Sequence, residues 1–170
     1  MITFVLGGAR SGKSVFAENL VKANAGSLAY IATGQAWDRE MKTRIELHQE
    51  RRADRWRTIE APTDLKAGLE AADGLPVLLD CLTLWVTNMM MRGERDPDFS
   101  MDAAFADLEA ALAATRSHVV IVSNEVGQGI VPDNKMARQF RDHAGTLHQR
   151  IAAMADEVYF VTAGLPQKLK

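Results

Sequence analysis

A glycine-rich segment near the start of the chain has the residue types and spacing of a phosphate-binding loop. Residues 7–14 read Gly-Gly-Ala-Arg-Ser-Gly-Lys-Ser, which fits the pattern G-x-x-x-x-G-K-[ST]. Glycines let backbone N–H groups curl around phosphate oxygens, and the N-terminus of a following helix adds positive potential. In this pattern the amine of Lys13 reaches the β- and γ-phosphates, and the hydroxyl of Ser14 can bind Mg²⁺. The segment predicts binding of a nucleoside triphosphate.

An ordinary glycine-rich turn is the alternative interpretation of this segment. A short apolar run at 2–6 precedes it, and a helical pattern of apolar residues at 13–24 follows it. A strand before the loop and a helix after it are the context that the phosphate-binding function requires. The sequence therefore favours a phosphate loop over a simple turn.

A carboxylate at the end of a neighbouring strand would complete such a site by holding Mg²⁺ or its water ligands. Asp80 ends the apolar run 76–80 and is the best candidate. The alternative for this side chain is a purely structural one, as the N-cap of a helix that we expect from residue 82. The presence of the phosphate loop favours the metal-binding role.

Short apolar runs that alternate with helical patterns must position these residues. We expect strands at 2–6, 28–32, 56–60, 76–80, 118–123 and 157–162. We expect helices at 13–24, 39–52, 62–72, 82–92, 101–115 and 134–155. This alternation predicts a single α/β domain over 1–170, with a mainly parallel sheet covered by helices on both faces. Ligands of such folds bind at the carboxyl ends of the strands.

Composition and charge exclude several classes of protein. The 170 residues carry 20 Lys and Arg against 22 Asp and Glu, so no broad positive charge favours nucleic-acid binding. A single cysteine, Cys81, cannot form an internal disulfide or a zinc cluster. No apolar run approaches the about 20 residues that span a bilayer. Without a recognisable signal peptide, the sequence predicts a cytoplasmic protein.

A regulatory GTPase is the first class of phosphate-loop protein to consider. Asn134-Lys135-Met136-Ala137 begins like the guanine-binding pattern N-K-x-D, but Ala137 stands where the carboxylate is needed. The residues after Asp80 lack the glycine of a D-x-x-G switch. Both patterns are incomplete, which argues against a GTPase switch.

Four further segments, together with residues 7–14, resemble one enzyme family along nearly the whole chain. They are Tyr30-Ile31-Ala32-Thr33; Glu40-Met41 with Arg44-Ile45 and His48; Trp56-Arg57-Thr58 with Glu60; and Asn124-Glu125-Val126-Gly127-Gln128-Gly129-Ile130-Val131-Pro132. The chain thereby resembles the bifunctional cobinamide kinase / cobinamide-phosphate guanylyltransferase family of adenosylcobalamin synthesis. It departs from the family at Ala53, where proline is usual, and at Gln49, where a basic residue is frequent.

The resemblance implies an enzyme with two reactions. The first phosphorylates the aminopropanol hydroxyl of adenosylcobinamide with ATP or GTP, and the second transfers GMP from GTP to adenosylcobinamide phosphate through a GMP–histidine intermediate. Mg²⁺, bound by Ser14 and Asp80, is the expected cofactor. The resemblance further implies a RecA-like phosphate-loop fold and a homotrimer.

The same resemblance assigns roles to individual residues. His48 corresponds to the histidine that becomes guanylylated, and Lys13 serves catalysis in the phosphate loop. The implied nucleotide contacts are Gly7, Gly8, Ala9, Arg10, Ser11, Gly12, Lys13, Ser14, Ala32, Thr33, Gly34, Gln49, Glu50, Arg51, Arg52, Glu60 and Asp80. Imidazole suits the covalent role, because it is a neutral nucleophile near pH 7. The other histidines, His118, His143 and His148, are expected to be surface or packing residues.

Two other functions stay open at this point. One is a phosphate-loop kinase for a small metabolite without a covalent histidine step, and the other is a module that senses nucleotide without turnover. The general base of a kinase reaction is also open, with Glu125 at a strand end as one candidate. Trp85 and Met89-Met90-Met91 are interpreted as helix packing, with a corrin or subunit contact as the alternative.

Overall fold

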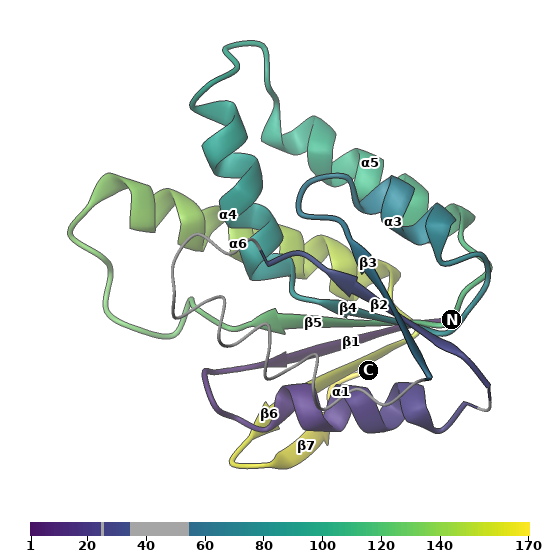
Figure 1. The fold of residues 1–170 in the computed structure, drawn as a ribbon. Helices are drawn as coiled ribbons and strands as arrows, with labels where there is room; N and C mark the ends of the chain where they lie inside the picture. The colour runs from purple at the N-terminus through teal and green to yellow at the C-terminus, as the bar shows by residue number, and fades with distance from the viewer. Residues whose placement is uncertain (25, 35–54) are drawn as a thin grey trace.

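A seven-stranded sheet forms the centre of the computed structural model, which describes residues 1–24, 26–34 and 55–170 (Figure 1). The sheet order is β3-β2-β4-β5-β1-β6-β7, and every pair of adjacent strands is parallel except β6 and β7. The strands are β1 (Ile2–Gly7), β2 (Leu28–Ala32), β3 (Trp56–Glu60), β4 (Val77–Asp80), β5 (Val119–Asn124), β6 (Glu157–Thr162) and β7 (Leu165–Lys168).

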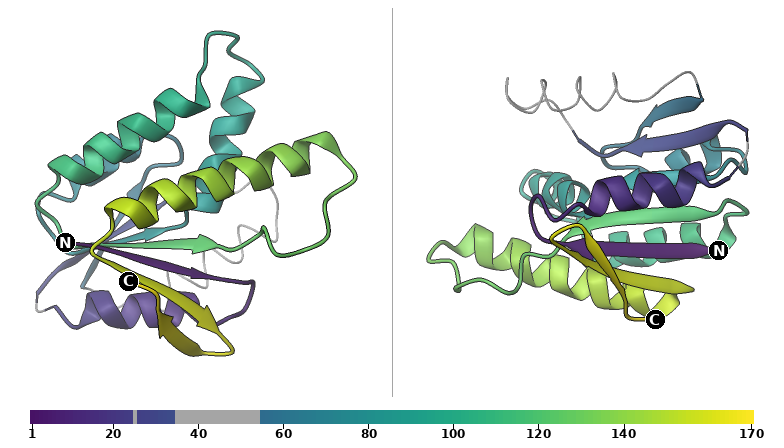
Figure 2. Two further views of the ribbon diagram at one scale, coloured as in Figure 1. Left: turned by 180° about the vertical axis from the view of Figure 1, so that it is seen from behind. Right: turned by 90° about the horizontal axis from the view of Figure 1, so that it is seen from below.

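Helices cover both faces of this sheet, as Figures 1 and 2 show. Among the described residues, α1 packs on one face, and the other four helices pack on the opposite face. The helices are α1 (Lys13–Lys22), α3 (Leu65–Ala71), α4 (Leu82–Gly93), α5 (Met101–Ala114) and α6 (Lys135–Met154). The α/β fold expected from the sequence is thereby confirmed.

The apolar runs form strands because side chains on both faces of the sheet are buried. Along β1, Phe4 packs toward α6 and its neighbours, whereas Val5 packs toward α1. In β5, residues 119–122 are all fully buried. Continuous Val, Ile and Leu runs are typical of parallel strands covered on both faces.

Two elements differ from the sequence-based expectation. Helix α3 begins at Leu65 and not at Pro62, because Asp64 is its N-cap and accepts a hydrogen bond from the N–H of Ala67. The carbonyl groups of Pro62 and Thr63 instead accept hydrogen bonds from side chains of α4. The expected helix at 39–52 lies entirely outside the described residues.

The sequence-based prediction missed β7. This short strand contains Pro166 and has no apolar alternation, yet it pairs antiparallel with β6. The turn between them passes through Ala163 and Gly164, whose φ angles are 51° and 81°. Positive φ at both central residues of a two-residue turn is the geometry that joins twisted antiparallel strands.

No helix in the described part of the chain has both the length and the apolar character needed to cross a membrane.

Two isoleucines provide a matched test of where the core lies. Ile121 in β5 is 0% exposed, whereas Ile130 in the loop before α6 is 97% exposed. We expect Ile121→Ala to lower the free energy of unfolding by about 2–5 kcal/mol, because it leaves a cavity between the sheet and its helices. Ile130→Ala should change it by no more than about 0.5 kcal/mol. Urea denaturation of both variants measures this difference, and equal destabilisation would contradict the described packing.

Candidate nucleotide-binding site

The parallel strands place the predicted site residues at one edge of the sheet. The register aligns Gly7 with Asn124, Asp80 with Val122 and Ala32, and Ala32 with Glu60. The phosphate loop, Asp80 and Glu60 therefore lie at the carboxyl ends of their strands, as expected for a ligand site in such a fold.

Asp80 is not on a strand adjacent to the phosphate loop, which corrects the sequence-based expectation. Strand β5 lies between β1, which leads into the loop, and β4, which ends at Asp80. Asp80 and Lys13 of the phosphate loop still interact electrostatically, because the negative charge of Asp80 raises the pKa of Lys13. The connection that decides this order is the crossover from β4 through two helices to β5, which local sequence patterns do not encode.

The phosphate loop has a backbone that only glycine accommodates at two positions. A Cβ atom on Gly7 would lie 2.5 Å from Ser11 Oγ and 2.6 Å from the carbonyl oxygen of Val161. Gly12 has φ 93° and would bring a Cβ atom within 3.0 Å of Gly164 Cα. The Ser11 carbonyl also accepts the N–H of Gly164 at 2.7 Å. The loop is thus packed against the turn between β6 and β7.

Lys13 begins α1 and is held inside the loop. Its residue is only 8% exposed, and its Nζ donates a hydrogen bond to the Gly8 carbonyl oxygen at 3.1 Å. Burial lowers the pKa of the Lys13 ammonium, and the charge of Asp80 partly opposes that shift. A partly desolvated ammonium gains electrostatic energy from an anionic partner, so this position suits a phosphate group.

Asp80 is held by a neighbouring strand and does not cap α4. Tyr30 on β2 donates its hydroxyl hydrogen to Asp80 Oδ2 at 3.1 Å. The N-cap of α4 is Cys81, so the N-cap interpretation of Asp80 is wrong. The peptide bond between Asp80 and Cys81 is cis. Burial, reinforced by the Asp80 charge, raises the pKa of the Cys81 thiol to about 11, which keeps it protonated and unreactive.

A buried hydrogen-bond network fixes the segments that follow β2 and β4. Thr33 Oγ1 donates to the Cys81 carbonyl oxygen and accepts the Cys81 N–H, both at 2.8 Å. Asn88 on α4 donates to the carbonyl oxygens of Thr33 and Pro62, each at 2.8 Å. Thr33 is fully buried, so its hydroxyl serves this network, and a nucleotide contact of its side chain stays a prediction.

Some of the other expected site residues lie at the carboxyl edge of the sheet, and the rest lie outside the residues that the structure describes. Glu60 ends β3 and is exposed, so it is accessible for the guanine contact that the resemblance implies. Ala32 ends β2 beside Asp80, and Gly34 follows shortly after. The remaining predicted residues lie outside the described residues: His48, Gln49, Glu50, Arg51 and Arg52.

A cluster at the carboxyl end of β5 was not anticipated from the sequence. His148 on α6 is 7% exposed, and its Nε2 lies 2.7 Å from Ser123 Oγ. Its Nδ1 lies 4.0 Å from Glu125 Oε2. The N–H of Glu125 donates to the carbonyl oxygen of Gly7 at 3.0 Å, which places the cluster beside the phosphate loop. A separation of 25 residues between Ser123 and His148 gave no sequence signal for this contact.

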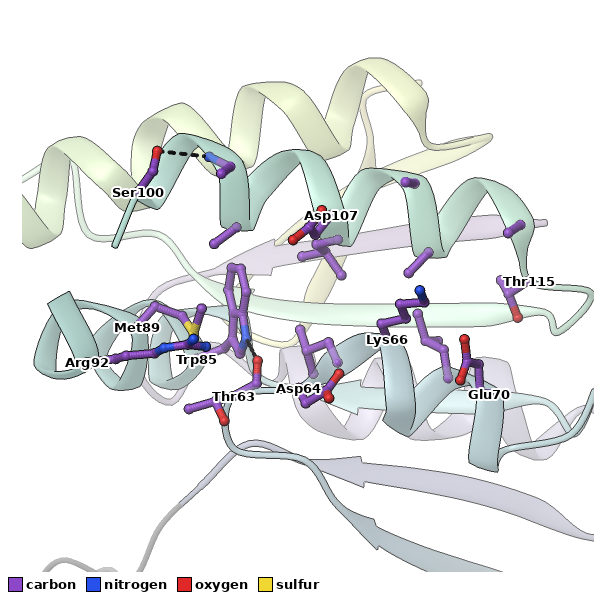
Figure 3. Close-up of a pocket in the computed structure, with 18 of the residues that line it drawn as sticks. Thr63, Asp64, Lys66, Glu70, Trp85, Met89, Arg92, Ser100, Asp107 and Thr115 are labelled. Atoms are coloured by element: carbon purple, nitrogen blue, oxygen red, sulfur yellow. Dashed lines mark hydrogen bonds between the residues drawn. The ribbon is translucent and has the colours of Figure 1, made fainter. Parts of the chain in front are cut away.

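A second concavity lies away from the phosphate loop. It has a volume of about 920 Å³ and lies between α3, α4 and α5, as Figure 3 shows. Trp85 and Met89 line it, but they are also buried in the main core, which confirms that they are packing residues. None of residues 7–14 lines this pocket, so it is separate from the nucleotide site.

Comparisons with known proteins identify the family of the chain. The family profile described as "Cobinamide kinase / cobinamide phosphate guanyltransferase" matches residues 3–169. The chain is 45% identical to the bifunctional adenosylcobalamin biosynthesis protein CobP of Pseudomonas aeruginosa, with 100% of this chain and 98% of the relative covered. It is 45% and 44% identical to the proteins named CobU from Salmonella typhimurium and Escherichia coli, with 100% of both chains covered in each case. The chain belongs to the cobinamide kinase / cobinamide phosphate guanyltransferase family.

Proposed function

We propose that the chain phosphorylates the aminopropanol hydroxyl of adenosylcobinamide and then transfers GMP from GTP to the new phosphate. The products of the second reaction are adenosyl-GDP-cobinamide and pyrophosphate. The observation that carries the proposal is the phosphate loop with Lys13 buried inside it and coupled to Asp80, in a chain that belongs to this family. Both reactions begin with a nucleoside triphosphate, so one cradle can serve both.

In the kinase reaction, the loop N–H groups and Lys13 bind the β- and γ-phosphates of ATP or GTP. The substrate hydroxyl attacks the γ-phosphorus, and the nucleoside diphosphate leaves with the electron pair of the broken P–O bond. Lys13 stabilises the charge that develops on the transferred group and the leaving oxygen. Its desolvated position strengthens this interaction relative to water.

The donor set at this edge fits Mg²⁺. Ser14 offers a hydroxyl and Asp80 a carboxylate, which are the oxygen ligands that Mg²⁺ prefers. In the described residues, no group of three or more His, Cys, Asp or Glu side chains forms a dedicated metal cage. This agrees with a magnesium ion held jointly by one or two protein groups, water and substrate phosphates. When bound, the ion neutralises phosphate charge.

For the second reaction we propose His48 as the nucleophile. Its imidazole attacks the α-phosphorus of GTP, and pyrophosphate leaves. An oxygen of cobinamide phosphate then attacks the same phosphorus and releases the histidine. The support is the sequence around His48 and the suitability of imidazole for a labile P–N bond. Guanine contacts by Glu60, and phosphate contacts by Arg51 and Arg52, belong to the same proposal.

The assembly and location of the protein stay predictions. We propose a single catalytic domain over 1–170, a homotrimer and a cytoplasmic location on the basis of the family resemblance.

Lys13→Ala should reduce both activities by at least about a hundredfold, because it removes the cation of the shared triphosphate cradle. Phosphorylation of cobinamide and guanylyl transfer to supplied cobinamide phosphate are measured separately. Lys22→Ala, at the exposed end of the same helix, is the matched control and should keep both activities. Near-normal turnover of either reaction by a folded Lys13→Ala protein would contradict the single-cradle proposal.

Asp80→Asn should raise the Mg²⁺ concentration at half-maximal activity on the order of tenfold. The amide keeps an oxygen that accepts the Tyr30 hydroxyl, so the strand end is preserved while the charge is lost. Asp107→Asn, on the exposed side of α5, controls for a general change in charge. An unchanged Mg²⁺ titration would leave Asp80 with a structural role only.

His48→Ala should abolish guanylyl transfer but leave most of the cobinamide phosphorylation. GTP labelled at the α-phosphate should mark the wild-type protein with an acid-labile, alkali-stable adduct, and the variant should stay unlabelled. His143→Ala is the control histidine. No label on the wild type would favour the simple kinase, and no product in either reaction would favour a nucleotide-sensing module.

A further inference from the structure

The cluster beside the phosphate loop holds one carboxylate in a defined orientation. Glu125 Oε1 accepts the N–H of Gly127, and Glu125 Oε2 faces the Nδ1 atom of His148 at 4.0 Å. The backbone N–H of Glu125 is bonded to Gly7, the first residue of the loop. The Glu125 side chain keeps 22% of its surface exposed, and Glu125 directly follows β5 at the carboxyl edge of the sheet.

His148 is suited to act on this carboxylate as a neutral hydrogen-bond donor. Burial lowers the pKa of the His148 imidazole more than the nearby Glu125 charge raises it. Ser123 Oγ lies 2.7 Å from Nε2, and its buried hydroxyl can donate to that nitrogen, in which case the ring proton lies on Nδ1. In this tautomer the proton-bearing Nδ1 is the ring atom that lies 4.0 Å from Glu125 Oε2, a distance that must shorten for a hydrogen bond to form.

The two reactions of the proposed function differ in their need for a base. The acceptor in the kinase reaction is an alcohol, whose proton must be removed as its oxygen attacks. The acceptor in the guanylyl transfer is a phosphate monoester, whose second pKa of about 6 leaves it ionised at neutral pH. A general base at this site should therefore matter for the first reaction only.

Among the described residues, Glu125 is better placed for this task than the other two carboxylates of the candidate site, Glu60 and Asp80. Strand β5, which Glu125 follows, is directly adjacent to β1, whereas Glu60 is the last residue of β3, which β2, β4 and β5 separate from β1. Asp80 has the metal-binding role proposed above.

We propose that Glu125 is the general base of the kinase reaction, and that His148, fixed by Ser123, is the positioning residue that orients its carboxylate. The inference rests on the proposed function. The hydroxyl proton of cobinamide moves to Glu125 as the alcohol oxygen forms its bond to the γ-phosphorus. The bond between the γ-phosphorus and its bridging oxygen breaks, and the nucleoside diphosphate leaves. Glu125 then releases the proton to solvent.

Glu125→Gln tests the base directly, because the amide oxygen still accepts the Gly127 N–H. Kinase kcat should fall by about 10²–10⁴-fold. Guanylyl transfer to supplied cobinamide phosphate should fall far less, so the ratio of the kinase rate to the transferase rate should fall by nearly the same factor as kinase kcat. Glu94→Gln, exposed at the end of α4, should leave both rates unchanged.

The outcome separates this inference from the function on which it rests. A wild-type protein that phosphorylates no cobinamide contradicts the proposed function itself. A wild type with both activities and a Glu125→Gln variant with an unchanged rate ratio overturns only the general base. Equal loss of both activities in Glu125→Gln also overturns it, because a structural role of the loop would then explain the effect.

Two isosteric replacements of His148 test the positioning role. An asparagine amide nitrogen takes the place of Nδ1 and can still donate to Glu125, whereas a glutamine amide takes the place of Nε2 and contacts Ser123. We expect His148→Gln to lower kinase kcat on the order of tenfold at unchanged KM for cobinamide, and His148→Asn to restore part of that loss. His148→Gln should add nothing further in a Glu125→Gln background. Equal kinase rates in the two single variants, or additive losses in the double variant, would overturn the positioning role.

Discussion

The close packing of the phosphate loop against the turn after β6 is the constraint on which the site depends. A Cβ atom on Gly12 would lie 3.0 Å from Gly164 Cα, and the Ser11 carbonyl oxygen accepts the N–H of Gly164. The antiparallel pairing of β6 with β7 fixes the conformation of this turn. The short C-terminal strand thus supports the conformation in which Lys13 is buried inside the loop. Elements at the two ends of the chain therefore determine one site.

Several buried polar groups at the same edge are paired with one another, whereas the buried Ser11 Oγ in the phosphate loop has no hydrogen-bond partner among the described residues. The Thr33 hydroxyl bonds both backbone groups of Cys81, and Asn88 fixes the carbonyl oxygen of Thr33. The Ser123 hydroxyl on β5 is hydrogen-bonded to Nε2 of His148 on α6. An unpaired buried donor or acceptor costs about 1–3 kcal/mol, so these networks strongly favour one arrangement of the loops after the strands. A phosphate-binding site requires such ordered loops, because catalysis depends on hydrogen-bond donors that are already oriented toward the phosphate oxygens.

The two proposed reactions use different groups along the carboxyl edge of the sheet. Lys13 and Asp80 lie where a triphosphate and its metal ion would bind, and this part suits both reactions. Glu125 lies one strand closer to the loop than Asp80 and serves only an acceptor that carries a proton. The large pocket between α3, α4 and α5 lies outside this arrangement.

The sequence by itself determined six of the seven described strands, most helix bounds, the phosphate loop and the family, because these depend on local periodicity and on motifs of contiguous residues. It also placed Asp80 at the correct edge, since parallel strands end on one side. Only the tertiary structure decided that β5 separates β4 from β1, that β7 completes the sheet, and that His148 meets Ser123 and Glu125. These contacts join residues far apart in the chain, and strand order and helix packing, which bring them together, leave no local pattern in the sequence.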